Sequence, residues 1–257
     1  PLSEGAVTEL VAAHVPGITH DSPLSRTLVS RGHGNPFLVL QYLQAVVDAG
    51  LLRPSWGTWI LDEEELAALD LPDDALRLVL ARMDGLGEEA QALLTTAAAV
   101  GSRFHPDLVA AACGIRGDRV RVALAEAEAR RVIDALPSGE YAFLHDRIRE
   151  ALLSALDETA LQKTHGRLAQ ALEEAETAGP GTVYAIADHL RQAGPGEDPD
   201  RVFRACLAAG RQALADGANA LAVDLLEYAV GTGIEPDPRF HLWLGEALRR
   251  EDRFEAA

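Results

Sequence analysis

The apolar residues of this chain return at helical spacing along almost its whole length, and this feature constrains the fold most. Val39, Tyr42, Leu43 and Val46 fall at positions i, i+3, i+4 and i+7. That spacing puts the four side chains on one face of a helix, because a helix makes a turn every ~3.6 residues. The same spacing recurs in residues 76–83, 90–97 and 120–127, and residues 148–156 form a similar face. The chain is therefore predicted to be mostly α.

The composition agrees with closely packed helices. Of the 257 residues, 48% are hydrophobic and only 5% are aromatic. Ala, Leu and Val must therefore fill most of the core, as they do where helices approach closely. A chain of this length has room for two or three small domains.

Two pairs of short β-prone runs interrupt the helical pattern. The first pair flanks a turn at 54–57, and an acidic connector follows it. The second pair flanks a turn at 137–140, directly after three helical segments. Helices followed by a hairpin are typical of a winged helix, with the hairpin as its wing.

The last part of the chain carries an internal repeat. Small and large apolar residues there have the spacing of a tetratricopeptide repeat (TPR), and Leu244-Gly245 restarts the pattern. Gly210 and Gly245 are 35 residues apart, and the repeat unit has about 34 residues. Small residues at these positions let two antiparallel helices approach closely. One TPR-like repeat and the start of another are therefore predicted.

The charge of the chain argues against several classes of partner. A formal net charge of −17 repels phosphate groups and anionic lipids. No run is long and apolar enough for a membrane span or a signal peptide, and Cys113 and Cys206 show no paired spacing. We expect a cytoplasmic protein with no membrane partner and no nucleic-acid partner.

Enzymatic chemistry and metal binding are not expected within this chain. A phosphate-binding P-loop needs a lysine after a glycine-rich turn, whereas the only lysine, Lys163, lies in a helical pattern without a preceding glycine. The eight histidines show no pair at the spacing of metal ligands, which favours exposed or helix-capping roles for them. We expect no autonomous ATPase, no other enzyme and no metal site.

A series of motifs runs in order through most of the chain, at residues 32–43, 48–52, 71–73, 80–86, 97–104 and 143–152. In this order they resemble the signal-transduction (STAND) class of bacterial multidomain AAA-type ATPases, found in large LuxR-type transcriptional regulators, adenylyl cyclases and fused kinases. In that class a P-loop core is followed by a small helical lid, a winged helix and helical repeats.

The resemblance implies four parts for this chain. They are a helical lid at 1–52, a hairpin and acidic linker at 53–71, a winged-helix domain at 72–157 and TPR-like repeats at 158–257. The chain has no initiator Met, and its last residues fall inside a helical pattern. We therefore expect a fragment of a larger protein whose P-loop core lies upstream in cis.

The resemblance also implies a nucleotide site shared with that core. Gly34, Asn35 and Pro36 match a motif of the lid, and the proline of this motif packs against adenine in the family. An equal alternative is that Pro36 only starts a helix. His145 and Asp146 resemble the winged-helix pair that senses the β-phosphate of ADP. A helix N-terminus with an adjacent imidazole suits an anion; the alternative is that Asp146 only caps the helix.

The expected function follows from these parts. A fragment of this kind would couple the ADP or ATP state of the core to partner binding by the repeats, in transcriptional regulation. Its partners would be the core in cis, an inducer or protein on the repeats, and a second copy in a nucleotide-dependent homo-oligomer.

Two alternatives stay open. The first is a TPR-like scaffold that binds proteins without any role for nucleotide. The second is DNA binding by the winged helix, whose candidate recognition helix at 116–131 has five arginines but also Asp118, Glu126 and Glu128.

Overall fold

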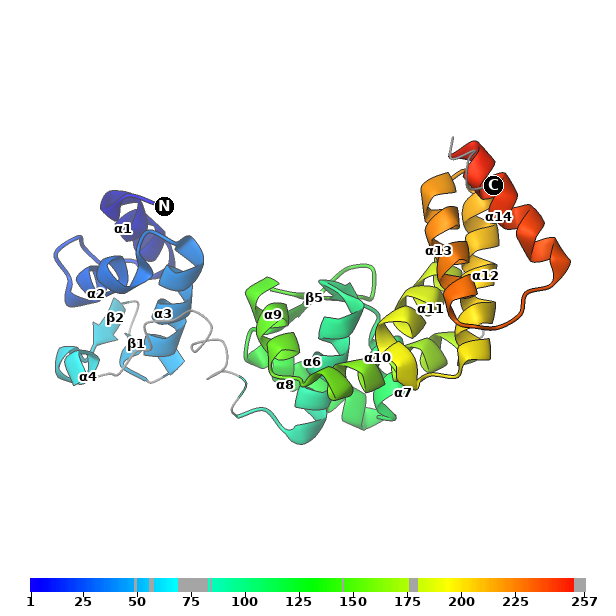
Figure 1. Ribbon diagram of the computed structural model, residues 1–257. Helices are drawn as coiled ribbons and strands as arrows, with labels where there is room; N and C mark the ends of the chain where they lie inside the picture. Colours follow the sequence, from blue (N-terminus) through cyan, green and yellow to red (C-terminus); the bar gives the residue numbers. More distant parts are fainter. Residues whose placement is uncertain are drawn as a thin grey trace. The chain divides into compact units, whose positions relative to one another are not determined.

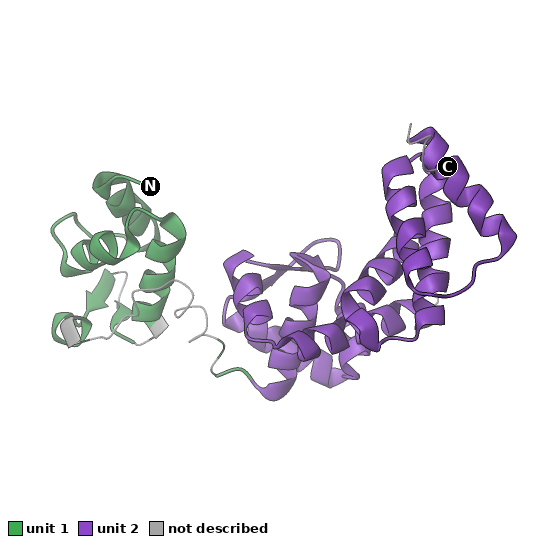
Figure 2. Cartoon of the chain, in the orientation of Figure 1, with its two compact units in different colours: residues 1–86 green, residues 87–257 purple. Residues whose placement is uncertain are grey.

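A computed structural model describes residues 1–48, 50–55, 58–68, 83, 85–144, 146–175 and 180–251. This part of the chain is mostly helical, with two small antiparallel sheets, and it confirms the predicted fold class (Figure 1). The chain divides into two compact units, Pro1–Leu86 and Gly87–Ala257 (Figure 2). None of the helices in these described residues is long and apolar enough to cross a membrane.

Unit 1 consists of a few helices around a hairpin. Its described elements are α1 (Glu4–His14), α2 (Pro23–Gly32), α3 (Pro36–Asp48), β1 (Leu52–Ser55), β2 (Thr58–Leu61) and α4 (Glu63–Ala68). The predicted stripe on α3 is its core face, because Val39, Tyr42 and Val46 are fully buried. β1 and β2 pair in antiparallel register, as the sequence predicts, with Leu52 opposite Leu61.

Unit 2 begins with three helices, a small sheet and a further helix. In chain order they are α6 (Glu88–Val100), β3 (Arg103–Phe104), α7 (Pro106–Cys113), α8 (Asp118–Ala129), β4 (Ile133–Ala135), β5 (Tyr141–Phe143) and α9 (Asp146–Ser154). The strands are antiparallel in the order β3-β5-β4. β4 and β5 form the hairpin that the sequence predicts around residues 137–140.

The helices of this part differ in one respect from the predicted trio. The predicted helix at 76–83 lies outside the described residues, except for Met83. The three helices observed before the β4–β5 hairpin are α6, α7 and α8, and of these α7 was not predicted. A helix of eight residues makes only about two turns and therefore shows little apolar period.

The remainder of unit 2 is an array of helices in which each packs on the next. The elements are α10 (Glu158–Glu174), α11 (Pro180–Ala193), the short 3-10 helix η1 (Gly194–Gly196), α12 (Pro199–Ala215), α13 (Asn219–Gly231) and α14 (Pro238–Arg250). A Cβ placed on Gly210 of α12 would lie 2.8 Å from Cγ of Leu226 on α13. This close approach confirms the predicted small position of the repeat.

α10 belongs to both halves of unit 2. It packs on α11 and also on α6 and α7. Leu168 and Ala171 of α10 share an apolar cluster with Ala99 of α6 and Ala112 of α7. The array of helices therefore continues directly from the three-helix part.

Candidate functional site

The turn Gly34-Asn35-Pro36 joins α2 to α3. His33 ends α2 in the left-handed conformation with φ +46°, and Gly34 follows with φ +71°. Oδ1 of Asn35 accepts a hydrogen bond of 3.0 Å from the backbone N of Phe37, and Pro36 is the first residue of α3. Asn35 and Pro36 are exposed and so are accessible to a ligand.

Gly34 is also required by packing within unit 1. The backbone N of Leu2 donates to the carbonyl of Gly34 at 2.6 Å. A Cβ on Gly34 would lie 2.6 Å from the Leu2 carbonyl oxygen. The turn therefore has a structural role whether or not it also contacts nucleotide.

The second half of the predicted site lies at the start of α9. Asp146 is the first residue of this helix and is exposed. His145 lies outside the described residues. Pro36 belongs to unit 1 and Asp146 to unit 2, so the shared nucleotide site remains a prediction.

Other residues of the resembling motifs have structural roles. Phe104 is buried between Tyr141 and Phe143 of β5, with ring centroids 6.0 and 5.6 Å away. Nε of Arg149 on α9 donates to the carbonyl of Ala98 on α6 at 2.7 Å. Two motifs that are distant in sequence, 97–104 and 143–152, therefore contact each other.

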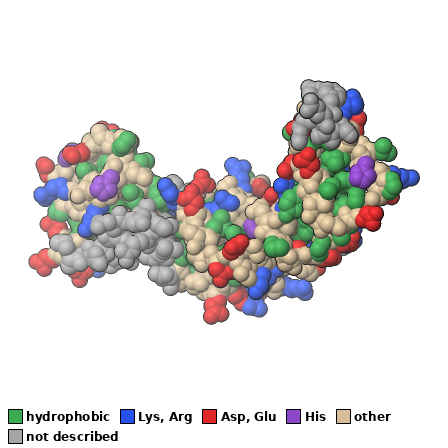
Figure 3. All heavy atoms as spheres, in the orientation of Figure 1, with side chains coloured by type: hydrophobic (Ala, Val, Ile, Leu, Met, Phe, Trp, Pro, Cys, Tyr) green, Lys and Arg blue, Asp and Glu red, His purple; other side chains and the backbone are tan. Residues whose placement is uncertain are grey.

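The predicted recognition helix is α8, and acidic groups bind its arginines. Arg119 forms an ion pair with Glu89 of α6, and Arg121 forms one with Asp118 at 2.9 Å. Acidic and basic side chains are interspersed on the face shown in Figure 3. A DNA-binding surface needs a concentration of positive charge, so this geometry does not favour DNA recognition.

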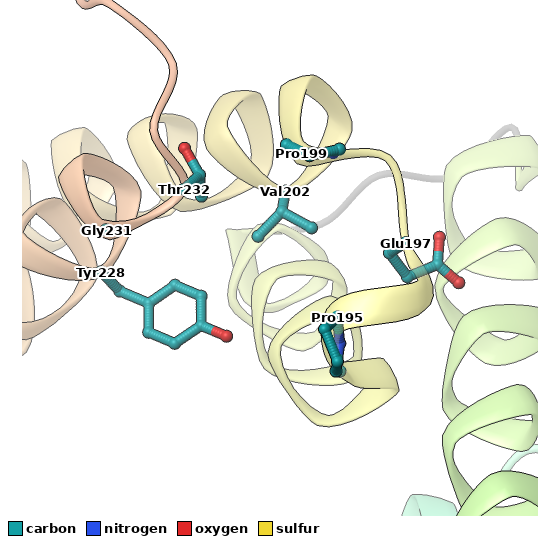
Figure 4. Close-up of a pocket in the computed structure, with 8 residues that line it drawn as sticks. Pro195, Glu197, Pro199, Val202, Tyr228, Gly231 and Thr232 are labelled. Carbon is teal, nitrogen blue, oxygen red and sulfur yellow. The ribbon is translucent and has the colours of Figure 1, made fainter.

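The TPR-like array contains two cavities. The first, of about 430 Å³, lies where η1, α12 and the end of α13 meet. Tyr228, Pro195 and Val202 point into it, whereas the carboxylate of Glu197 points away from Tyr228 (Figure 4). The guanidinium of Arg191 lies 4.6 Å from the centroid of the Tyr228 ring. An apolar lining with an aromatic side chain is suited to an apolar group of a partner.

The second cavity, of about 440 Å³, is lined by residues of α10, α11 and α12. Arg201 lies in its wall and bridges two helices. It donates to Glu173 of α10 at 2.9 Å and to Glu197, which precedes α12, at 2.7 Å. The hydrogen bond with Glu173 is the main cause that raises the pKa of Arg201.

A buried pair of histidines was not predicted. His165 of α10 and His189 of α11 are 3% and 6% exposed, and their Nδ1 atoms are 2.9 Å apart. The interpretation of the histidines as exposed or capping residues is therefore wrong for this pair. It is confirmed for His105, whose Nδ1 accepts from the backbone N of Asp107 at the start of α7. Within the described residues, no group of three or more His, Cys, Asp or Glu side chains could hold a metal.

Fold and cavities together define the class of this protein. It is a mostly α protein with small antiparallel sheets and a TPR-like array that contains cavities. No family model matches the chain.

A solved structure has a similar fold. It is a STAND protein with a tetratricopeptide repeat sensor from Pyrococcus horikoshii, with a TM-score of 0.52 and 15% sequence identity over 99% of this chain and 41% of that chain. At this identity the likeness concerns the fold alone. The fold agrees with the resemblance in the motifs.

A curated protein matches part of the sequence. The hybrid signal transduction histidine kinase G of Dictyostelium discoideum is 26% identical over 121 residues, which are 44% of this chain and 4% of the kinase. The chain spans less than half of the length of either protein.

Proposed function

We propose that this chain is the regulatory and sensor part of a STAND-type ATPase, and that its TPR-like repeats bind a protein partner. The observation that carries the proposal is the fold likeness over 99% of the chain to a STAND protein with a TPR sensor. The order of lid, winged helix and repeats supports it. The activity of the whole protein would depend on a P-loop core that this chain does not contain.

In the proposed mechanism, ADP or ATP bound to that core selects between two packings of the chain. Pro36 would contact the adenine, and His145 with Asp146 would contact the β-phosphate of ADP. A ligand can shift such an equilibrium only if it binds the two packings with different affinities. Loss of the ADP contacts would then free the repeats to bind an inducer or a second copy, with transcription as the regulated output.

Two structural features support this mechanism. Asn35 and Pro36 are exposed at the start of α3, and Asp146 is exposed at the start of α9. The exposed start of α9 presents the positive end of its helix dipole to an anion.

The test is ADP titration by calorimetry on the protein joined to its P-loop core, with Pro36→Ala and His145→Ala. Each variant should weaken ADP binding about tenfold, the loss expected for one good contact. Pro106→Ala, at the start of α7, and His241→Ala, at an exposed position, are the matched controls. Unchanged affinity in both test variants would refute the assigned contacts.

The alternative is a scaffold whose repeats bind a partner without any nucleotide. The two cavities in the TPR-like array favour partner binding in either case. The two functions differ in whether nucleotide changes that binding. Equal partner affinity with ADP, with ATP and without nucleotide would establish the scaffold.

A further inference from the structure

Arg149 connects α9 to α6 through a hydrogen bond from its side chain. Its Nε donates to the carbonyl of Ala98 at 2.7 Å, across 51 positions of the sequence. Ala98 is fully buried, and Arg149 is half-buried. The bond therefore joins α9 to α6 at a partly buried position of unit 2.

The acceptor is one of the last carbonyls of α6. The last four carbonyls of a helix lack a partner within the helix and form its negative end. The backbone N of Gly101 binds the carbonyl of Ala97 at 3.2 Å, and Arg149 binds the next one. A guanidinium at this position makes a charge-assisted bond that also suits the helix dipole.

The same turn of α6 contacts the first helix of the repeats. Ala99 packs in one apolar cluster with Leu168 and Ala171 of α10, and Leu153 of α9 borders that cluster. The last turn of α6 thus lies between α9 and α10. A movement of α9 can pass through α6 to α10 and then to α11, because α9 packs on α6, α6 on α10 and α10 on α11.

We propose that Arg149 is a positioning residue that couples α9 to the repeats through the last turn of α6. The proposal rests on the proposed function, in which nucleotide is sensed at the start of α9. Arg149 would not contact nucleotide itself. It would keep α9 and α6 moving together, so that a change at Asp146 reaches α10.

The test compares hydrogen exchange of the α10, α11 and α12 amides with ADP and with ATP, in the protein joined to its P-loop core. The variants are Arg149→Ala and Arg149→Lys, and the latter retains a cation and a donor. The control is Arg121→Ala, because Arg121 is 76% exposed and pairs with Asp118 of its own helix. ADP affinity is measured on all of them.

In the wild type and in Arg121→Ala, we expect exchange in the repeats to differ between ADP and ATP. In Arg149→Ala this difference should vanish, while ADP affinity changes by less than about twofold because no ligand contact is removed. Exchange at the end of α6 should become about tenfold faster, as loss of one charge-assisted bond implies. Arg149→Lys should restore part of the difference.

Three results would overturn the inference. An undiminished nucleotide-dependent difference in Arg149→Ala would show that α9 and the repeats are coupled by other contacts. If that variant does not fold, the same undiminished difference in Arg149→Met, which keeps an extended side chain without a donor, would have this meaning. Absence of any difference in the wild type would refute the proposed function and the inference together.

Discussion

Nδ1 of His165 lies 2.9 Å from Nδ1 of His189, and this contact joins α10 to α11 inside unit 2. One ring must donate and the other accept, so the pair fits two neutral imidazoles. Burial, with a further contribution from His189, lowers the pKa of His165 from 6.5 to about 4, and Asp188 opposes the shift. Burial also lowers the pKa of His189, again opposed by Asp188.

The histidine pair predicts a loss of stability in acid. Because the pKa of His165 is lower in the folded state, the unfolded chain binds more protons between pH 6.5 and about 4. The free energy of unfolding should be greatest above pH 6.5 and fall by on the order of a few kcal/mol toward pH 4. Urea unfolding at several pH values measures it.

Variants separate this effect from the titration of carboxylates. Replacing both buried histidines with Gln should flatten the decline between pH 6.5 and 4, whereas His241→Gln, at an exposed position, should leave it as in the wild type. An equal decline in all three proteins would assign the acid sensitivity to other groups.

Two glycines at equivalent repeat positions should respond oppositely to Ala. At Gly210 the new Cβ would lie 2.8 and 2.9 Å from the buried Leu226 side chain, so Gly210→Ala should lower stability by about 1–3 kcal/mol. At Gly245 no described atom lies within 4 Å, and Gly245→Ala should raise stability by up to about 1 kcal/mol through helix propensity. Thermal unfolding distinguishes the two, and equal effects would contradict the close packing of α12 on α13.

Arg201 should matter more for stability than Arg204, although both form ion pairs on α12. The Arg201 side chain is 24% exposed and binds Glu173 and Glu197, so Arg201→Ala should cost about 1–3 kcal/mol. Arg204 is 68% exposed and pairs with Asp200 one turn away, so Arg204→Ala should cost less than about 0.5 kcal/mol. Urea unfolding compares them, and similar losses would show that the bridge from α10 contributes little.

The turn at residues 34–36 should tolerate a change at Pro36 better than one at Gly34. Gly34→Ala combines a strained φ of +71° with a contact of 2.6 Å to Leu2, and should cost about 2–4 kcal/mol. Gly17→Ala has a positive φ without a close contact among described atoms, and should cost about 1–2 kcal/mol. Pro36→Ala should cost less than about 1 kcal/mol. Circular dichroism melts test this order, and a large loss for Pro36→Ala would point to a structural rather than a ligand-binding proline.

Local patterns predicted most of the secondary structure. The stripe of Val39, Tyr42 and Val46 is the buried face of α3, and the turn at 137–140 connects β4 to β5. α7 was not predicted because it is short. β3 was not predicted because a strand of two residues cannot show alternation of apolar and polar side chains. The predicted site could be located only in part, since His145 lies outside the described residues and Pro36 and Asp146 belong to different units.

The amino-acid sequence by itself determined most of the helical segments, their order, and the 35-residue spacing of Gly210 and Gly245, because these properties depend on periodicity along the chain. Tertiary structure alone decided that His165 contacts His189, that Arg149 donates to the carbonyl of Ala98, and that Arg201 of α12 binds Glu173 of α10. Each pair brings together residues 24 to 51 positions apart, and such a contact leaves no period in the sequence. It arises only when packing places two helix faces against each other.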